Sequence, residues 1–478
     1  MTTAEPRLAV IGAGPAGLAA ALAAADRGLG VTLLDAADGP GGQFYRQPAP
    51  ALGARRPEAL HHRWSAWRRL RARLAGHLAT GQVRQLTAHH VWCAERSPGG
   101  FLVHALYGPG QDRPVTVRAA GLVLATGGYE QVLPFPGWTL PGVVTAGGAQ
   151  ALLKGNLVRA GHRAVVAGTG PLLLPVAAGL AATGTRVAAL VEAADPREFT
   201  RCAAVLAGYP AQLAEAAGYA AALLRHRVPV RPRHTVVRAH GTVRLEAVTV
   251  AALDGRGRVR SGTGRRIACD TLAVGHGLLP STELARVLGC RTEDRGVTVD
   301  PEQRTDVPGI WAAGETTGGG GAALALAEGH IAGCSAAARL AGRAPDSAGW
   351  AGAARTRGRL RRFAAVLEPL YGPPAHWDEQ LTDDTPVCRC EEVDAGTVRA
   401  AVRDLGAGDA RTAKLLTRAG MGWCQGRMCG PAVAALAGGG ARPTPGPFAR
   451  PVPLGVLARA GEEPEEAVPG HRATPPGP

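Results

Sequence analysis

A glycine-rich loop near the start of the chain limits the possible fold more than any other feature. The run Gly12-Ala13-Gly14-Pro15-Ala16-Gly17 stands between an apolar strand, Arg7 to Ile11, and an Ala-rich helix, Pro15 to Arg27. In a strand–loop–helix unit the first glycine permits a tight turn, the second lets a pyrophosphate approach the backbone, and the third lets the helix pack close to the strand. The helix N-terminus adds unpaired amides and a positive dipole end. The loop therefore predicts a dinucleotide-binding βαβ unit.

An acidic residue and a second pair of glycines extend this unit. The next strand, Val31 to Leu34, ends at Asp35, where a carboxylate can accept hydrogen bonds from a ribose diol. The following Gly41-Gly42-Gln43 places adjacent glycines where a loop can wrap the rest of a dinucleotide. At this point the sequence resembles the two-dinucleotide-binding flavoproteins, in which such a pair follows the ribose acid. The resemblance implies FAD rather than NAD as the first ligand.

Two later segments agree with this resemblance. Ala125-Thr126-Gly127 follows a buried strand, and the run from Thr305 to Glu315 contains another strand and ends in a glycine-rich loop. In relatives this run usually ends in Asp, which contacts the ribityl or phosphate region of the flavin, whereas Glu315 has a longer reach. The residues assigned to FAD binding are Gly12, Gly14, Pro15, Ala16, Gly17, Asp35, Gly41, Gly42, Gln43, Arg46, Thr126, Gly127, Gly314 and Glu315.

A second nucleotide-type unit follows in the middle of the chain. A strand from Arg163 to Ala167, the loop Gly168-Thr169-Gly170-Pro171-Leu172-Leu173, a helix and a strand from Arg186 to Val191 lead to Glu192. Leu173 takes the third glycine position, where a bulky side chain pushes the helix off the strand and disfavours ordinary NAD(P)H binding. Glu192 could hold an adenosine ribose and would repel a 2′-phosphate. Three interpretations stay open for Gly168, Gly170, Pro171 and Glu192: an adenine nucleotide (ATP or NAD) in a structural or unusual role, a vestigial empty site, or a working NADH site.

Four clustered cysteines near the C-terminus form a candidate metal centre. They are Cys388 and Cys390 in a Cys-x-Cys pair and Cys424 and Cys429 in a Cys-x4-Cys pair. Thiolates suit zinc and iron–sulfur clusters, but structural zinc sites prefer pairs spaced by two to four residues. The spacing resembles the 2Fe-2S domain typified by bacterioferritin-associated ferredoxin. Zinc and unliganded thiols are the alternatives.

The sequence thus predicts an α/β chain with two Rossmann-like three-layer dinucleotide-binding domains, one inserted in the other, and a small helical iron–sulfur domain. The insertion follows because the buried strands Gly121 to Leu124 and Gly309 to Ala313 have to return to the first unit. In the last domain we expect helices from Asp394 to Leu405 and from Leu415 to Ala419. The expected domains are FAD binding, 1–145 and 276–345; second dinucleotide binding, 146–275; connecting region, 346–385; iron–sulfur, 386–437; and a Pro/Gly-rich tail, 438–478, most of which we expect to be flexible.

The remaining cysteines do not indicate dithiol chemistry. The disulfide reductases among these flavoproteins carry a closely spaced cysteine pair beside the flavin. This chain has none around Gly42, and its inserted domain has only the distant Cys202 and Cys269. Five isolated cysteines are expected to behave as small core residues: Cys93, Cys202, Cys269, Cys290 and Cys334.

The net charge of +15 comes mainly from scattered Arg, with Lys only at Lys154 and Lys414. The densest basic stretch, Arg63 to Arg73 with Trp64 and Trp67, could be a nucleic-acid face or a solvated surface helix. We expect the surface helix and no nucleic-acid partner. No apolar run of about 18 residues is present, so no transmembrane segment is predicted, and the first seven residues lack the features of a signal peptide. We expect a cytoplasmic location, with peripheral membrane association left open.

The order of these modules resembles the FAD-containing subunit of multi-subunit amino-acid and amine dehydrogenases, the group of proline and hydroxyproline dehydrogenases, opine oxidases and hydrogen cyanide synthase. The runs that support this resemblance are Gly41 to Gln47, Ala125 to Glu130, Pro134 to Val143 and Thr145 to Gln150. It implies an oxidoreductase acting on CH-NH or CH-NH2 donors through a second flavoprotein subunit resembling D-amino-acid oxidase, and leaves room for a small ferredoxin-like subunit. This chain would relay electrons, because flavin exchanges one or two electrons and a 2Fe-2S centre only one. A self-contained NADH-dependent reductase and a non-catalytic redox sensor or cluster-delivery protein are the alternatives.

Overall fold

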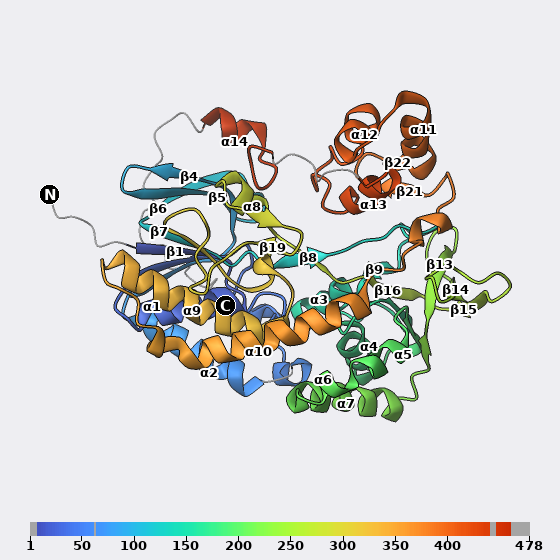
Figure 1. The fold of residues 1–478 in the computed structure, drawn as a ribbon, viewed down its shortest axis with the longest axis horizontal. Helices are drawn as coiled ribbons and strands as arrows, with labels where there is room; N and C mark the ends of the chain where they lie inside the picture. The colour runs from blue at the N-terminus through green and yellow to red at the C-terminus, as the bar shows by residue number, and fades with distance from the viewer. Residues whose placement is uncertain (1–6, 62–63, 440–445, 460–478) are drawn as a thin grey trace, which may run out of the picture.

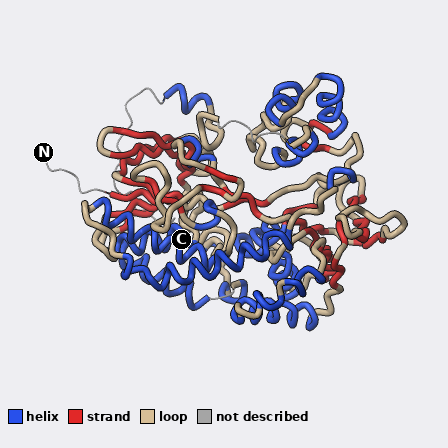
Figure 2. Tube along the Cα trace, viewed as in Figure 1, coloured by secondary structure: helices blue, strands red, loops and turns tan. Residues whose placement is uncertain are grey.

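A computed structural model describes residues 7–61, 64–439 and 446–459 of the chain (Figure 1). The described part contains two parallel sheets, each covered by helices on one face and by an antiparallel sheet on the other, and a small helical module near its end (Figure 2). None of the helices in these residues is long and apolar enough to cross a membrane. The predicted N-terminal segment before Arg7 lies outside the described residues.

The first parallel sheet has the strand order β20-β7-β1-β2-β3. Its strands are β1 (Arg7–Ile11), β2 (Gly30–Leu34), β3 (Val83–Leu86), β7 (Gly121–Leu124) and β20 (Ile310–Ala312). Side chains alternate between its faces: Leu8 and Val10 face the helices, whereas Ala9 and Ile11 face the antiparallel sheet. The antiparallel layer consists of β4 (His89–Ser97), β5 (Gly100–Tyr107) and β6 (Arg113–Ala119).

The helix that follows the first glycine loop is buried on all sides. Helix α1 (Pro15–Ala25) lies between the sheet and α9 (Gly321–Leu340), which explains why its sequence is apolar all round rather than amphipathic. A Cβ at Gly329 would lie 2.0 Å from the backbone oxygen of Ala16, and one at Gly333 would lie 2.2 Å from that of Ala20. The two helices therefore touch through their backbones, a contact that only small residues permit.

The second parallel sheet is inserted into the first unit, as predicted. Its strand order is β12-β11-β10-β16-β9, and the chain enters and leaves it through the antiparallel pair β8 (Gly128–Glu130) and β17 (Leu278–Pro280). Its strands are β9 (Val143–Thr145), β10 (Arg163–Gly168), β11 (Arg186–Glu192), β12 (Val230–Pro232) and β16 (Thr271–Gly275). The covering elements are α3 (Ala146–Asn156), α4 (Leu173–Ala182), α5 (Pro196–Arg201), α6 (Ala203–Leu206), α7 (Pro210–Arg225), β13 (His234–His240), β14 (Ala247–Ala252) and β15 (Arg265–Ala268).

A long helix joins the dinucleotide-binding units to the last module. Helix α10 (Ala351–Leu367) packs along α9, and the segment after it reaches the inserted unit, where the ring of Tyr371 lies 5.3 Å from that of Phe199 (Figure 1). Three shorter elements precede β20 in the chain: α8 (Glu283–Val287), β18 (Thr292–Glu293) and β19 (Gly296–Val297). The connecting region thus touches both units.

The C-terminal module has its own small core, formed by Val387, Val398, Ala413 and Val433 among others. Its elements are β21 (Pro386–Cys388), β22 (Val393–Asp394), α11 (Ala395–Leu405), α12 (Ala410–Thr417) and α13 (Gly430–Leu436). The first helix agrees with the prediction, whereas the second, predicted from Leu415 to Ala419, overlaps α12 but starts and ends too late. Helix α12 starts earlier because the Asp409 side chain caps it, accepting hydrogen bonds from the amides of Arg411 and Thr412.

The expected flexible tail is partly ordered. Within residues 446–459 the buried Ala449 packs against the first unit, and helix α14 (Leu454–Arg459) places Val456 on Trp92 and Leu106. The amide of Ala449 donates to the backbone oxygen of Trp92 over 2.8 Å. A few apolar residues thus suffice to anchor this part of the Pro- and Gly-rich segment. The rest of the tail lies outside the described residues.

The basic stretch forms the surface helix α2 (Trp64–Ala79). Trp67 is only 2% exposed and stacks on Tyr45, with ring centroids 5.2 Å apart, so its ring faces the core rather than solvent. The arginines between the apolar positions, such as Arg68 and Arg69, are exposed. Arg63 lies outside the described residues.

Candidate functional site

The first glycine loop has the geometry of a phosphate-binding turn. A Cβ at Gly12, whose φ is +104°, would lie 2.3 Å from the backbone oxygen of Ala125, and one at Gly17 would lie 1.7 Å from that of Gly12. At Gly14, in contrast, the nearest atom to a Cβ would be the Gly42 Cα at 3.9 Å. Gly12 and Gly17 are thus required by the fold itself, whereas Gly14 leaves an open side on which a ligand can approach.

The start of α1 offers amides to an anion. Gly14 precedes the helix, Pro15 occupies its first turn without a backbone N–H, and no side chain caps the N-terminus. The first-turn amides, including those of Ala16 and Gly17, therefore have no side-chain partner, and the helix dipole favours negative charge there. This combination fits the pyrophosphate of a dinucleotide.

Asp35 is fixed beside this loop. Its Oδ2 accepts a hydrogen bond from the amide of Ala13 over 2.5 Å, and its Oδ1 accepts one from that of Ala37 over 2.7 Å. Burial raises the pKa of the Asp35 carboxyl, while these two hydrogen bonds oppose the shift. Carboxylate oxygens accept more than one hydrogen bond, so Asp35 retains capacity for a ribose hydroxyl.

The second glycine pair wraps around the first loop. Gly41 and Gly42 have φ values of +124° and +57°, and a Cβ at Gly42 would lie 2.7 Å from the Gly14 Cα. The loop then exposes Gln43, whose Oε1 accepts a hydrogen bond from Arg46 over 3.0 Å. The two predicted glycine motifs, which are separate in the sequence, thus form one continuous surface.

The predicted Thr126 and Glu315 make protein contacts of their own. The Thr126 hydroxyl donates to the backbone oxygen of Ser281 over 2.8 Å, and Gly127, with a φ of +71°, faces open space. Oε1 of Glu315 accepts a hydrogen bond from the amide of Gly321 over 3.1 Å, at the start of α9, and burial raises the pKa of its carboxyl. Glu315 therefore uses part of its longer reach to bind α9, and its contact with FAD stays a prediction.

Glu328 is a structural residue of this site that the sequence did not reveal. It is 1% exposed and accepts hydrogen bonds from the Gly314 amide and the Thr317 hydroxyl, both over 3.0 Å. Arg361 of α10 forms an ion pair with it, with 2.6 Å between Nη2 and Oε1. The glycine loop at Gly314 is thereby held by a buried pair whose members come from two different helices.

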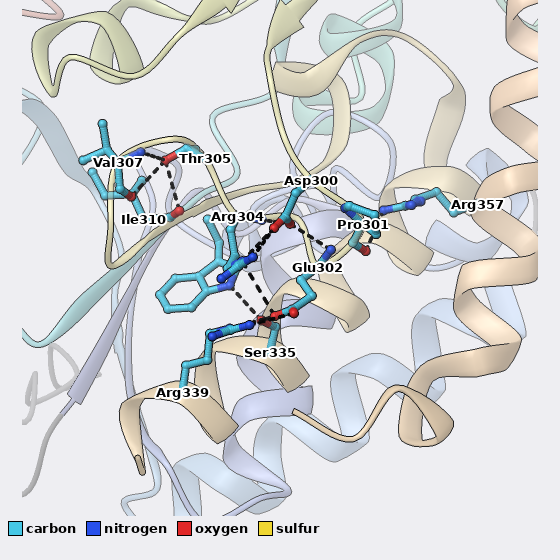
Figure 3. A network of polar contacts seen from close by, with 11 residues as sticks. Asp300, Pro301, Glu302, Arg304, Thr305, Val307, Ile310, Ser335, Arg339 and Arg357 are labelled. Atoms are coloured by element: carbon cyan, nitrogen blue, oxygen red, sulfur yellow. Dashed lines mark hydrogen bonds and ion pairs between the residues drawn. The ribbon is translucent and has the colours of Figure 1, made fainter. Parts of the chain in front are cut away.

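A polar network holds the segment that leads into Gly314 (Figure 3). Glu302 accepts two hydrogen bonds of 2.7 Å from Arg339 and one of 2.8 Å from Ser335, both on α9. The hydrogen bond from Arg339 lowers the pKa of the Glu302 carboxyl to about 2. Arg357 of α10 donates to the backbone oxygen of Pro301 over 2.9 Å. The network fixes this predicted FAD segment to both long helices.

The second nucleotide-type loop repeats the arrangement around Asp35. Oε2 of Glu192 accepts from the Gly170 amide over 3.3 Å, and its Oε1 accepts from the Ala194 amide over 3.1 Å. A Cβ at Gly168 would lie 1.7 Å from the backbone oxygen of Gly275. Asp35 and Glu192 thus make the same two contacts: each accepts a hydrogen bond from an amide of its glycine loop and another from the amide two residues further along the chain. This geometry is compatible with an adenosine ribose at Glu192.

Leu173 changes the start of the helix in this second unit. Helix α4 begins at Leu173, three residues after Gly170, whereas α1 begins directly after Gly14. The amide of Leu173 donates instead to the oxygen of Gly170 over 3.2 Å, in a tight turn that takes up a potential phosphate donor. Pro171 lies in this turn. The Leu173 side chain is itself 1% exposed in the core, which disfavours ordinary phosphate binding by this loop.

Replacing Glu192 by Gln should stabilise the nucleotide-free chain at pH 8 but not at pH 5. Burial raises the pKa of the Glu192 carboxyl from 4.5 to about 7, so between these values the folded chain holds a proton that the unfolded chain releases. Wild-type stability therefore falls as pH rises through this window, by at most about 3 kcal/mol. Thermal unfolding at pH 5, 6, 7 and 8 measures the difference, with the partly exposed Glu198→Gln as control. The prediction would be contradicted if the melting temperatures of wild type, Glu192→Gln and Glu198→Gln changed equally with pH.

The four clustered cysteines lie together in the C-terminal module. Neighbouring thiols interact in the order Cys390, Cys424, Cys429, Cys388, so the four lie side by side, and the Gly420 amide donates to Cys388 Sγ over 3.5 Å. The interaction between Cys424 and Cys429 lowers the pKa of Cys424 to about 5 and raises that of Cys429, so Cys424 is the first of this pair to become a thiolate. In the described residues, no group of three or more His, Cys, Asp or Glu forms a site for a single metal ion. A 2Fe-2S cluster needs a pair of thiolates on each of its two irons, and these two pairs fit that requirement.

A chain of contacts links the cysteine loop to the FAD loops. Arg427, between Cys424 and Cys429, forms an ion pair of 2.8 Å with Glu283. Glu283 also accepts a hydrogen bond from Ser281, whose backbone oxygen binds Thr126. On the other side of the module, Trp138 Nε1 donates to the backbone oxygen of Pro386 over 2.6 Å. The module is therefore fixed to both dinucleotide-binding units.

Three of the five isolated cysteines have their predicted role as core residues, Cys93 lies at the edge of a core cluster, and Cys202 belongs to no core cluster of the described residues. Cys269, Cys290 and Cys334 are buried, and Cys93 and Cys202 are partly buried. Burial raises the pKa of Cys269 to about 12, so this thiol is a poor nucleophile at neutral pH.

Comparison with known families agrees with this two-part site. The family model described as pyridine nucleotide-disulphide oxidoreductase matches residues 6–341. The chain belongs to this family. A second model, described as a BFD-like [2Fe-2S] binding domain, matches residues 386–437 and contains all four clustered cysteines. The chain is accordingly an FAD-dependent oxidoreductase with a 2Fe-2S domain.

Relatives that align over most of their length are named as enzyme subunits. Hydrogen cyanide synthase subunit HcnB of Pseudomonas aeruginosa is 34% identical, and the alignment covers 88% of this chain and 90% of the relative. An opine oxidase subunit of Rhizobium meliloti is 33% identical, with 94% and 97% covered. The predicted relationship to this group of subunits is confirmed.

Solved structures support the fold. L-proline dehydrogenase from P. horikoshii matches with a TM-score of 0.63 and 20% identity, covering 95% of this chain and 80% of that one. T. acidophilum thioredoxin reductase matches with a TM-score of 0.51 and 20% identity, covering 70% and 99%. These similarities confirm the predicted fold class. The roles of the individual site residues stay predictions.

Proposed function

We propose that this chain is the electron-transfer subunit of an amino-acid or amine dehydrogenase complex and passes electrons between FAD and a 2Fe-2S cluster. The observation that carries the proposal is the physical link between the two sites. Arg427 in the cysteine loop is paired with Glu283, which is joined through Ser281 to Thr126 beside the FAD glycines. A chain that holds both sites in one rigid arrangement is suited to moving electrons between them.

In the proposal, some residues of the site bind FAD and others hold the binding loops in position. FAD supplies the conversion between a two-electron donor and a one-electron acceptor. In the proposal, the α1 amides and Gly14 bind the pyrophosphate, and Asp35 binds the adenosine ribose. Glu328 and Arg361 hold the loop at Gly314 in place.

In the proposal, a partner oxidises the substrate. We infer a second flavoprotein subunit resembling D-amino-acid oxidase that acts on CH-NH or CH-NH2 donors such as proline, hydroxyproline, opines or glycine. A small ferredoxin-like subunit is a further candidate partner. The names of the two relatives as subunits of hydrogen cyanide synthase and opine oxidase support this division. A cytoplasmic location is part of the same proposal.

For the second unit we propose an adenine nucleotide, ATP or NAD, in a structural role. The paired amide contacts of Glu192 support a ribose at this site, and the tight turn at Leu173 argues against a working NADH site. A self-contained NADH-dependent reductase is the alternative that this feature disfavours.

Anaerobic spectra of the chain, alone and with its co-expressed partner subunits, test the proposal. We expect proline, hydroxyproline, glycine and opines to bleach the flavin of this chain only when the partner is present, and NADH to bleach it slowly or not at all. Amine dehydrogenase turnover by the chain alone would refute the division of labour. Rapid bleaching by NADH alone would instead favour the self-contained reductase.

A further inference from the structure

Lys154 is a largely buried cation at the contact between the inserted unit and the FAD loop. It lies in the last turn of α3, a helix close to the junction of the two units (Figure 1), and its Nζ donates to the backbone oxygen of Phe44 over 3.5 Å. The same Nζ lies 5.9 Å from the centroid of the Phe44 ring. Among the residues that the structure describes, no carboxylate lies within ion-pair distance of this ammonium group. One long hydrogen bond and one ring face are weak compensation for a buried charge.

Arg46 brings a second cation to the same contact. A Cβ at Gly155, next to Lys154, would lie 3.1 Å from the Arg46 Cδ, so the Arg46 side chain packs directly on α3. The Arg46 Nε is buried and has no hydrogen-bond partner within the described residues. Its Nη2 donates to the neutral Gln43 side chain, and its charge opposes the rise that burial causes in the pKa of the nearby Asp35 carboxyl. Lys154 and Arg46 thus both contribute to the contact between the FAD loop and α3, and the Arg46 Nε is left without a partner among the described residues.

The position of Lys154 in a helix does not account for this arrangement. A lysine in the last turn of a helix interacts favourably with the helix dipole, and it can do so while its ammonium group remains in water. Lys154 instead directs its ammonium toward the loop after Gly42, where burial lowers its pKa to about 8. A buried cation without a counter-ion lowers the stability of a fold, so an anion that arrives with a ligand would explain why the residue is placed there.

We propose that Lys154, together with Arg46, forms an anion-binding site for the FAD of this chain. The proposal rests on the assignment of FAD to the first glycine loop. The negative charge can come from two parts of the ligand: the pyrophosphate, which is always charged, or the isoalloxazine ring, which gains negative charge on reduction. In either case Lys154 contributes to the site from the inserted unit, so the FAD site includes residues of both dinucleotide-binding units.

A Lys154→Met variant of the full chain tests this site, because methionine keeps much of the side-chain volume and removes the charge. We expect the FAD-free variant to melt at the same temperature as wild type or higher, since an uncompensated charge has been removed. We also expect the variant to lose about tenfold in FAD affinity or, at equal affinity, to have a more negative flavin reduction potential. A tenfold change in relative affinity for reduced and oxidised FAD corresponds to about 30 mV for a two-electron couple. Lys414→Met, which changes the only other lysine, is the matched control.

If the variant binds oxidised FAD more weakly, Lys154 binds the pyrophosphate. If it binds oxidised FAD normally but has a shifted reduction potential, Lys154 binds the reduced isoalloxazine ring. Because the chain has two lysines, NMR of ¹³C-dimethylated protein gives a second, independent measurement. The Lys154 signal should shift when oxidised FAD binds in the first case and only on reduction by dithionite in the second. Unchanged affinity, potential and Lys154 signal in a chain that binds FAD would overturn this inference alone. A wild-type chain that binds no FAD would overturn the proposed function as well.

Discussion

Replacing Gly14 by Ala is expected to give a chain that folds normally and binds FAD roughly 100-fold more weakly, a loss of about 3 kcal/mol. The backbone of Gly14 is extended, with φ −71° and ψ −175°, a conformation open to any residue. An added Cβ would meet no atom closer than the Gly42 Cα at 3.9 Å, so the FAD-free fold gives it room. The same Cβ would stand on the side where the pyrophosphate approaches the backbone.

Two other glycines provide matched controls for this prediction. Gly17→Ala should fail to fold stably, because its Cβ would lie 1.7 Å from the Gly12 oxygen. In Gly179→Ala, in α4, the added Cβ meets nothing within 4 Å, so this variant should keep wild-type stability and wild-type FAD affinity. Thermal unfolding of the FAD-free proteins and fluorescence titration with FAD separate folding from binding. Wild-type FAD affinity in the Gly14→Ala chain would contradict the prediction, because it would mean that the pyrophosphate does not bind beside Gly14.

The contrast between these glycines shows why the FAD unit could be predicted from the sequence. A strand, a glycine loop, a helix and an acid at the end of the next strand are consecutive, so their spacing alone brings Gly12, Gly17 and Asp35 together. Local steric rules then decide which positions must be glycine. The same rules apply to the second loop, where Leu173 predicts a departure from ordinary nucleotide binding and where the helix begins three residues after Gly170.

Contacts between distant segments could not be predicted in this way. Glu328 and Arg361 are 33 residues apart and meet only because α10 packs along α9. Lys154 and Phe44 are 110 residues apart and meet only because the inserted unit folds back on the FAD loop. No periodicity or spacing encodes such pairs.

A single cap and a few apolar residues account for the shifted bounds of one predicted helix and for the ordered part of the tail. Helix α12 has eight residues, and its start depends on the single capping side chain of Asp409, which the apolar pattern does not contain. In the tail, Ala449 and Val456 anchor a segment whose composition is typical of disorder. In both cases one or two specific contacts outweigh the average character of the segment.

A Cys429→Ser variant is expected to lose the 2Fe-2S cluster and to keep FAD. Cys429 is buried at the centre of the thiol network, in contact with both Cys388 and Cys424, and serine is a poor replacement for a thiolate that binds iron. The FAD loops contact the cysteine module through Arg427 and Glu283 rather than through Cys429, so flavin binding should persist. Iron content should fall from about two atoms per chain to a small fraction, with loss of the cluster's visible absorption and of its electron paramagnetic resonance signal after reduction.

The same Cys429→Ser variant distinguishes the two proposed steps, reduction of the flavin and transfer of its electrons through the cluster. With the partner subunit present, an amine substrate should still bleach the flavin, because that step precedes the cluster, whereas reduction of a one-electron acceptor should become much slower. Cys202→Ser, at a partly buried cysteine in the inserted unit, should change neither iron content nor acceptor reduction. About one zinc per wild-type chain, with no iron after anaerobic purification, would overturn the cluster assignment in favour of a structural metal site. Unchanged acceptor reduction in a Cys429→Ser chain that lacks iron would instead show that electrons leave the flavin without passing through the cysteine module.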